Sequence, residues 1–147
     1  MDKAYIQKVD IRWADLDPNF HVLHSKYYDF GAFCRMAYFV EKGFSAPVMQ
    51  QLNIGPILFR EECFFRREIN FGDEVKINFL VKSFTSGYGR WSVMHEITKG
   101  DGILCAIINV DGAWLDLTKR KLALPPETVA PIFEDAPKSP DFMIREK

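Results

Sequence analysis

The sequence predicts an α+β fold in which one long helix packs against an antiparallel sheet. Residues 26–42 are apolar around most of the helix circumference, which is typical of a buried helix. Farther along, apolar and polar residues alternate in several segments, as they do in strands with one buried face. With a strand at about residues 4–13, the expected order of elements is β-α-β-β-β-β.

The residues around the helix predict its ends. Asp17 precedes Pro18, and a residue before proline favours extended geometry, so this pair predicts a turn. Ser25 is the expected N-cap, because its hydroxyl can accept a hydrogen bond from a free N–H of the first helical turn. Gly43 is the expected stop, since glycine readily adopts the left-handed conformation that ends helices.

Four strands are expected after the helix. The alternating segments lie at residues 59–71, 75–82, 90–97 and 103–117, and Gly72-Asp73, residues 86–89 and residues 100–102 supply turns between them. Residues 103–110 are apolar on both faces, which predicts an interior strand and suggests that a second subunit covers the sheet. Residues 46–56 predict a loop or a short extra helix.

The length of 147 residues fits a single domain with a substantial core. We expect this domain to span residues 1–124. Residues 125–147 predict a short helix that begins at Pro126, followed by a proline-containing tail that is pinned at the surface or frayed.

The composition excludes several classes of protein. The formal net charge of −1 provides no field that would recruit nucleic acid or an acidic membrane. No apolar run is long enough to span a bilayer, and the N-terminus lacks the apolar segment of a signal peptide. The three cysteines are scattered among apolar residues, so we expect buried free thiols and a reducing cytoplasm.

The most informative candidate for catalysis is Asp17, at the turn before the buried helix. A carboxylate beside the free N–H groups of a helix start is the minimum equipment for hydrolysing an acyl group. An aspartate is ionised at neutral pH, so it can attack a carbonyl or activate a water. The alternative is that Asp17 only opens the turn. Asp15 is a possible second acid, although a solvated strand end is the favoured interpretation.

The remaining candidates are weaker. His21 and His24 have no third ligand at a suitable spacing, so no metal site is expected. His21 is expected either to line a pocket or orient Asp17, or to have a plain capping or surface role. His95 lies on a mostly apolar strand face and is expected to be a core histidine. Cys34 has no feature that would activate a thiol, so we expect it to be a packing residue.

Three segments carry a resemblance to a known family. WADLDPNFHVLHSKYYDF resembles the acidic turn and tyrosine-rich helix start of the hotdog-fold acyl-CoA thioesterases, in particular the branch that includes 4-hydroxybenzoyl-CoA thioesterase. FREECFFRREINFGDEVKI is similar to the second and third strands of that family. GAWLDLTKRKLALPPE is similar to its last strand and proline-rich exit. The resemblance covers about residues 4–127.

The resemblance implies a fold, an assembly and a reaction. The hotdog fold wraps a five-stranded antiparallel sheet around a long central helix, and two such units pair into a homodimer, or a dimer of dimers (a homotetramer), with the site at the subunit interface. Asp17 matches the catalytic carboxylate of the family, and the backbone N–H of His24 matches the donor that polarises the thioester carbonyl. The substrate is an acyl-CoA, with no cofactor and no metal.

Other residues are expected to contact the substrate. Phe20, His21 and Ser25 lie around the catalytic turn. Lys82 and Arg90 are candidates for the phosphates of coenzyme A, although a solvated basic face explains each of them as well. Many members of the family carry a glycine in place of Phe20, and often an Asn or an aromatic in place of Leu23, so the acyl specificity of the family is not transferred to this chain.

Three other functions remain open. A thioesterase for acyl-carrier protein would differ only in what holds the pantetheine arm. A non-catalytic hotdog protein that binds acyl groups or serves in assembly would be favoured if Phe20 filled the pocket. A dehydratase is disfavoured, because Glu41 lies near the wrong end of the helix to act with a histidine base.

Overall fold

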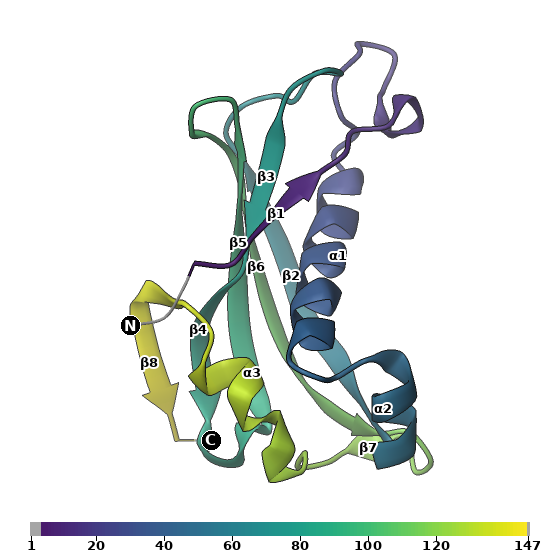
Figure 1. Cartoon of the computed structure of the whole chain (residues 1–147), viewed down its shortest axis with the longest axis vertical. Helices are drawn as coiled ribbons and strands as arrows, with labels where there is room; N and C mark the ends of the chain where they lie inside the picture. The colour runs from purple at the N-terminus through teal and green to yellow at the C-terminus, as the bar shows by residue number, and fades with distance from the viewer. Residues whose placement is uncertain (1–3, 147) are drawn as a thin grey trace.

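The computed structural model describes residues 4–146, and a long helix lies against a strongly curled sheet (Figure 1). The helices are α1 (Lys26–Glu41), α2 (Ala46–Leu52) and α3 (Ala130–Glu134), with 3-10 turns at Trp13–Asp15, Ser86–Tyr88 and Glu127–Val129. The strands are β1 (Ile6–Val9), β2 (Ile54–Phe65), β3 (Val75–Asn78), β4 (Leu80–Thr85), β5 (Arg90–Lys99), β6 (Ile103–Asp116), β7 (Lys121–Leu122) and β8 (Lys138–Arg145).

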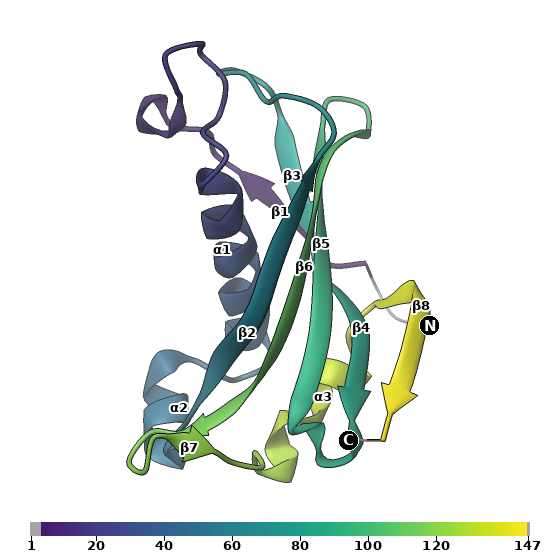
Figure 2. The ribbon, with the colours of Figure 1, turned by 180° about the vertical axis from the view of Figure 1, so that it is seen from behind.

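The sheet is organised around its two longest central strands. β6 pairs antiparallel with β2 on one side and with β5 on the other, and β5 continues the sheet to β3 and β4. β1 pairs with β3, so β1 and β2 are the strands on either side of α1 (Figure 2). The predicted α+β fold, with a central helix wrapped by an antiparallel sheet, is confirmed. The interior strand predicted at residues 103–117 is β6.

Several elements differ from the sequence prediction. The segment expected as one strand at residues 75–82 forms two, β3 and β4, because the fully buried Phe79 interrupts the ladder and its N–H bonds to Tyr5 O instead. β2 begins at Ile54, five residues before the expected start, since an edge strand tolerates Pro56. It ends at Phe65, where the N–H groups of Arg66 and Arg67 both donate to Cys105 O.

The C-terminal segment is more ordered than the prediction of a pinned or frayed tail. α3 carries Ile132 and Phe133, which are fully buried in the same core as α1. β8 then pairs with β4, and this is the parallel pair of the sheet among residues 4–146. A parallel pairing between two distant segments leaves no local turn signal in the sequence, which is why it was not anticipated.

The two ends of α1 are terminated differently. Ser25 occupies the N-cap position, but it has helical dihedral angles (φ −67°, ψ −24°) and its hydroxyl makes no capping hydrogen bond. The capping role predicted for Ser25 is therefore wrong, because that bond requires an extended N-cap residue. Gly43 has φ +90° immediately after Lys42, so the predicted stop is confirmed.

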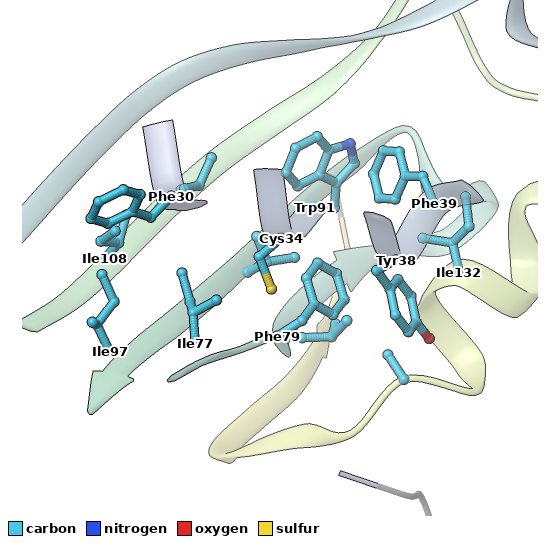
Figure 3. Close-up of a cluster of buried hydrophobic side chains, with 14 of the residues drawn as sticks. Phe30, Cys34, Tyr38, Phe39, Ile77, Phe79, Trp91, Ile97, Ile108 and Ile132 are labelled. Atoms are coloured by element: carbon cyan, nitrogen blue, oxygen red, sulfur yellow. The ribbon is translucent and has the colours of Figure 1, made fainter. Parts of the chain in front are cut away.

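The core lies between α1 and the concave face of the sheet. Phe30, Cys34 and Tyr38 point from the helix toward Ile77 and Phe79 (Figure 3). All three cysteines are free; Cys34 and Cys105 are buried, and Cys63 is half-buried. Burial raises the pKa of the Cys34 thiol to about 12, so this cysteine is a packing residue in its ordinary protonated form.

Gly112 on β6 is closely packed against the side chain of Trp91 and the backbone of Ile57. A Cβ at this position would overlap the indole ring of Trp91 and lie 2.7 Å from the carbonyl oxygen of Ile57. We expect Gly112→Ala to lower the free energy of unfolding by about 1–3 kcal/mol, because the backbone atom cannot move aside. Urea denaturation measures the change. Gly55→Ala on β2 is the control, since its Cβ would meet the flexible Leu117 side chain; an equal loss in both variants would contradict the packing argument.

Candidate active site

The segment between β1 and α1 is attached to the connection between β2 and β3. Leu16 and Val22 form an antiparallel bridge within the segment, and His21 bridges to Asn70. The N–H of Val22 also donates to Ile69 O at 2.9 Å. These bonds hold the Asp-Pro turn above the N-terminal end of α1, against chain that lies about fifty residues later in the sequence.

Asp17 is fixed by the backbone of its own turn. Its Oδ1 accepts hydrogen bonds from the N–H of Asn19 at 2.8 Å and the N–H of His21 at 3.2 Å. The backbone of Asp17 is closed on the same turn, since its N–H donates to His21 O at 2.8 Å. Within residues 4–146 no donor lies within hydrogen-bond distance of Oδ2. One carboxylate oxygen is therefore anchored and the other is available for chemistry.

A cavity of about 330 Å³ joins this carboxylate to the start of α1. The backbone N–H of His24 finds no acceptor in the described part of the chain, as expected of the free donors that precede a helix. The cavity is lined by Asp17, His21, Val22, His24, Tyr27, Phe65, Arg66, Arg67 and Glu68. The structure thus places Asp17, His21 and His24, three of the residues selected from the sequence, around one cavity.

His21 does not orient Asp17 with its ring. The ring Nε2 lies 3.1 Å from Glu68 Oε2, whereas the backbone N–H of His21 is the group that bonds to Asp17. His21 therefore lines the cavity and links the two segments that form it.

Phe20 and Ser25 do not line the cavity. Phe20 is 60% exposed and its ring lies 6.0 Å from that of Trp13. Its φ of 67° places it in the left-handed region, which glycine adopts without strain. Within one chain, Phe20 therefore contributes no wall to the cavity of Asp17.

Lys82 and Arg90 also lie away from this cavity. Lys82 Nζ is 3.5 Å from Asn109 Oδ1 and 4.0 Å from Asp141 Oδ2. The Arg90 guanidinium lies over the ring of Phe59, at 4.9 Å from its centroid. Arg90 begins β5, whereas Lys99 at the other end of that strand lies beside the cavity and donates to Glu68 O. Within one chain, neither Lys82 nor Arg90 contributes to the site around Asp17.

Sequence reasoning missed the other six residues of the cavity, which are Val22, Tyr27, Phe65, Arg66, Arg67 and Glu68. Arg66 and Arg67 place two exposed cations at its rim, and the signal for them was the basic pair that interrupts the alternation at the end of β2. Tyr27 and Phe65 form an apolar wall, with ring centroids 4.9 Å apart. Burial raises the pKa of Tyr27 to about 12, so its hydroxyl stays protonated at neutral pH. Only the tertiary structure brings these two rings together.

Asp15 is not the solvated acid that the sequence suggested. Its side chain is buried and accepts three hydrogen bonds from Arg12, the shortest at 2.8 Å from Nη2. The Arg12 guanidinium holds the pKa of the Asp15 carboxyl below its usual value. Asp15 O also accepts a bond from the N–H of Leu23, so this residue supports the loop that carries Asp17.

The lowered pKa of Asp15 predicts acid lability. A carboxyl that is easier to ionise when folded stabilises the protein above its unfolded pKa of about 4. That contribution is lost as the pH falls through the lower folded pKa. We expect the unfolding free energy of Asp15→Asn to depend less steeply on pH below about pH 4 than that of the wild type. Denaturant titrations across this range measure the slope, and parallel slopes would contradict the assignment.

His95 forms part of a buried polar chain across the core. Arg35 Nη1 lies 3.2 Å from His95 Nε2, and His95 Nδ1 lies 2.7 Å from Asn78 O. Because arginine can only donate, Nε2 must accept and Nδ1–H must donate to Asn78 O. His95 is therefore a neutral, satisfied core histidine, as predicted. Burial, aided by the charge of Arg35, lowers its pKa to about 3.

Two further features concern the class of protein. Among residues 4–146, no three His, Cys, Asp or Glu side chains are grouped so as to hold a metal ion. No helix in the same range combines the length and the apolar character that crossing a bilayer requires.

Comparison with known structures supports the fold. A Staphylococcus aureus protein solved with CoA superposes with a TM-score of 0.85 at 17% identity, covering 95% of this chain and 89% of that one. A 1,4-dihydroxy-2-naphthoyl-CoA thioesterase from Synechocystis gives 0.80 at 16% identity, over 90% and 97% of the two chains. A Thermus thermophilus thioesterase solved with coenzyme A and Zn gives 0.72 at 24% identity, over 88% and 90%.

Comparison of the sequence gives the family. Among curated proteins, none matches this chain significantly. The model of the thioesterase-like superfamily matches residues 11–133, which include the Asp-Pro turn, α1 and the whole sheet except β1 and β8. A match over most of the chain establishes membership, and the chain therefore belongs to the thioesterase-like superfamily.

Proposed function

We propose that this protein is an acyl-CoA thioesterase whose reaction centre is the cavity between Asp17 and the start of α1. One observation carries the proposal: Asp17, whose carboxylate has one oxygen without a donor, and His24, whose backbone N–H has no acceptor in the described part of the chain, line the same cavity. Thioesters have an electrophilic carbonyl and a good leaving group, so these two groups suffice for hydrolysis. Membership of the thioesterase-like superfamily supports the same reaction.

In the first version of the mechanism, Asp17 acts as a general base. Its free Oδ2 takes a proton from water, and the hydroxide attacks the thioester carbonyl carbon. The negative charge that develops on the carbonyl oxygen is stabilised by the N–H of His24. The carbon–sulfur bond then breaks, and the proton passes from Asp17 to the CoA thiolate. General-base catalysis contributes about 10²–10⁴-fold, and an oxyanion donor about 10²–10³-fold.

In the second version, Asp17 is the nucleophile. Oδ2 attacks the carbonyl carbon, CoA leaves, and a mixed anhydride forms that water then hydrolyses. A single turnover in ¹⁸O-labelled water separates the two versions. Direct attack of water places the label in the carboxylic acid product. Hydrolysis of an anhydride at the aspartyl carbon places the label in Asp17, which mass spectrometry of the peptide detects.

The rim of the cavity suits coenzyme A. Arg66 and Arg67 are exposed cations next to the entrance, and guanidinium groups pair well with phosphates. Two of the structural neighbours were solved with coenzyme A bound, which supports an acyl-CoA as the ligand of this protein. We expect Arg66→Ala combined with Arg67→Ala to raise KM for acyl-CoA much more than it changes kcat.

We also propose that the protein works as a homodimer or dimer of dimers. Within residues 4–146, β2 pairs only with β6, so one edge of this twelve-residue strand has free backbone groups. Phe59, Phe64 and Phe65 are about half exposed along it, which is unusual for an edge strand of a monomer. The strand edge left without a partner is therefore that of β2. The sequence instead pointed to residues 103–110, which belong to β6, as the place where a second subunit covers the sheet. A monomer by light scattering that still hydrolyses thioesters would contradict the proposal.

A free-thiol assay with purified protein tests the function. The substrates are aliphatic and aromatic acyl-CoAs of increasing length, with the corresponding acyl-carrier-protein thioesters in parallel. Release of CoA from at least one series at enzymatic rates supports the proposal, and faster release from carrier protein would favour the carrier-protein thioesterase. No release from either would favour a non-catalytic acyl-binding protein, although Phe20 does not fill the cavity as that role would lead one to expect.

A further inference from the structure

The hydroxyl of Tyr27 has no hydrogen-bond partner among residues 4–146. The side chain of Tyr27 is only 3% exposed, and it lines the cavity that also contains Asp17. The indole nitrogens of Trp91 and Trp114 lack partners in the same range, but those two atoms are sealed in the core, whereas the Tyr27 hydroxyl is not. Tyr27 therefore brings a polar group to the cavity from a side chain that is otherwise buried.

The ring that carries this hydroxyl is held in place by two other aromatic rings. Its centroid lies 4.9 Å from that of Phe65, in an edge-to-face arrangement, and 6.2 Å from that of Phe30. Phe30 is buried on the same helix, and Phe65 is the last residue of β2. Packing of this kind restricts the ring to one orientation. The hydroxyl is therefore pre-positioned, and a ligand that bonds to it does not have to order the side chain first.

The hydroxyl lies near the sheet and not near the loop before α1. Burial raises the pKa of Tyr27, and the nearby side chains of Cys105, Cys63 and Glu68 raise it further. Cys105 belongs to β6, Cys63 belongs to β2, and Glu68 follows β2 in the chain. The carboxylate and the backbone N–H of the proposed mechanism belong instead to the loop before α1. A thioester carbonyl bound by those two groups leaves the Tyr27 hydroxyl for another part of the substrate.

The cavity is small and largely apolar around this hydroxyl. Ligand pockets usually measure about 300–1,000 Å³, so a volume of about 330 Å³ suits a short acyl group or a single ring. Val22, Phe65 and the ring of Tyr27 offer it apolar walls. A purely apolar acyl group placed against these walls would leave the hydroxyl without an acceptor, which is unfavourable for a buried donor. An oxygen on the acyl group would supply that acceptor.

From these observations, we propose that the protein prefers short acyl groups that carry a hydroxyl or keto oxygen, and that Tyr27 is the residue that selects them. The Tyr27 hydroxyl donates to this oxygen while the thioester carbonyl lies between Asp17 and His24. A site that hydrogen-bonds a substituent discriminates against the analogue that lacks it. The inference rests on the proposed thioesterase function, because it assigns the substrate class of the same site.

The test measures binding, so that it does not depend on turnover. The ligands are CoA thioethers, which cannot be hydrolysed, in sets that differ only in one oxygen. One set has butyl, hydroxybutyl and oxobutyl chains, with the oxygen on each carbon beyond the first, and the other has benzyl and its hydroxybenzyl isomers. Calorimetry gives Kd for each. We expect the best oxygen-bearing ligand to bind about tenfold more tightly than its parent, as one satisfied buried donor predicts.

One variant and a matched control assign the preference to a single hydroxyl. Tyr27→Phe keeps the ring that packs against Phe30 and Phe65, so the variant should fold, and it should lose the tenfold preference while its Kd for the parent ligands stays within about twofold of the wild type. Tyr28→Phe is the control, because Tyr28 is the next residue of α1, is half-buried and does not line the cavity. Its preference should match that of the wild type.

The outcomes separate this inference from the proposed function. Equal Kd values within every set, or the same loss of preference in Tyr27→Phe and Tyr28→Phe, would overturn the inference. A loss of affinity in Tyr27→Phe that is equal for parent and oxygen-bearing ligands would also overturn it, because the hydroxyl would then contact the part that all the ligands share. Absence of binding by all the thioethers would overturn it too. A preference that depends on Tyr27, together with no hydrolysis of the matching thioesters, would support the inference and refute catalysis.

Discussion

Replacing Asp17 by Asn should lower turnover at least about a hundredfold and leave substrate binding nearly unchanged. The amide oxygen of asparagine can still accept the N–H groups of Asn19 and His21, so the turn should keep its shape. The amide has neither the basicity nor the nucleophilicity of the free oxygen in the wild type. Steady-state kinetics with the best acyl-CoA, together with Kd for its thioether analogue, measures both effects.

Asp29→Asn is the matched control for this experiment. Asp29 is an exposed acid in the first turn of α1, and it does not line the cavity of Asp17. The Asp29→Asn substitution should leave kcat within a few-fold of the wild-type value. Undiminished turnover in Asp17→Asn would remove Asp17 from the mechanism, and equal losses in both variants would indicate a general effect of charge near the helix start.

Mild acid should destabilise the protein through His95. Its pKa is lowered to about 3 in the folded state, whereas an unfolded histidine titrates near pH 6.5. Between these two values the unfolded chain binds one more proton than the folded chain, so stability rises with pH in this window and falls as the pH drops below about 6.5. The loss between pH 7 and pH 5 should be about 2 kcal/mol.

Urea denaturation at several pH values tests this prediction. His95→Gln removes the titrating ring, so its unfolding free energy should vary less between pH 7 and pH 5 than that of the wild type, whatever its absolute stability. His24→Gln is the control, since it removes an exposed histidine instead of the buried one. The pH range in which His95 affects stability lies above the range in which Asp15 affects it, which is below about pH 4. An unchanged slope in His95→Gln would show that His95 is not the group responsible.

Local signals were sufficient for the elements that local chemistry controls. The stop at Gly43 and the strand at residues 103–117 depend on backbone preference and on burial over a short stretch. The Asp-Pro turn predicted the position of Asp17 for the same reason: among residues 4–146, its carboxylate accepts hydrogen bonds only from N–H groups within four residues. Ser25 does not cap the helix because its own backbone is already helical, which the identity of the residue does not reveal.

Distant contacts were not predictable in this way. Arg66 and Arg67 meet Asp17 across about fifty residues of sequence, and β8 joins β4 across more than fifty. Lys82 and Arg90 were chosen for their charge at expected strand ends, but charge alone does not say at which end of a curled sheet a residue lies. Register and curvature decide that, and neither is encoded by the identity of a single residue.

The sequence by itself determined that a long apolar helix packs on an antiparallel sheet and that an acidic turn precedes the helix, because hydrophobic periodicity and the preferences of proline and glycine act over a few residues. Only the tertiary structure decided which groups share a cavity with Asp17 and that Phe20 faces outward. Those arrangements depend on how the sheet curls around the helix, and the curl results from packing across the whole core.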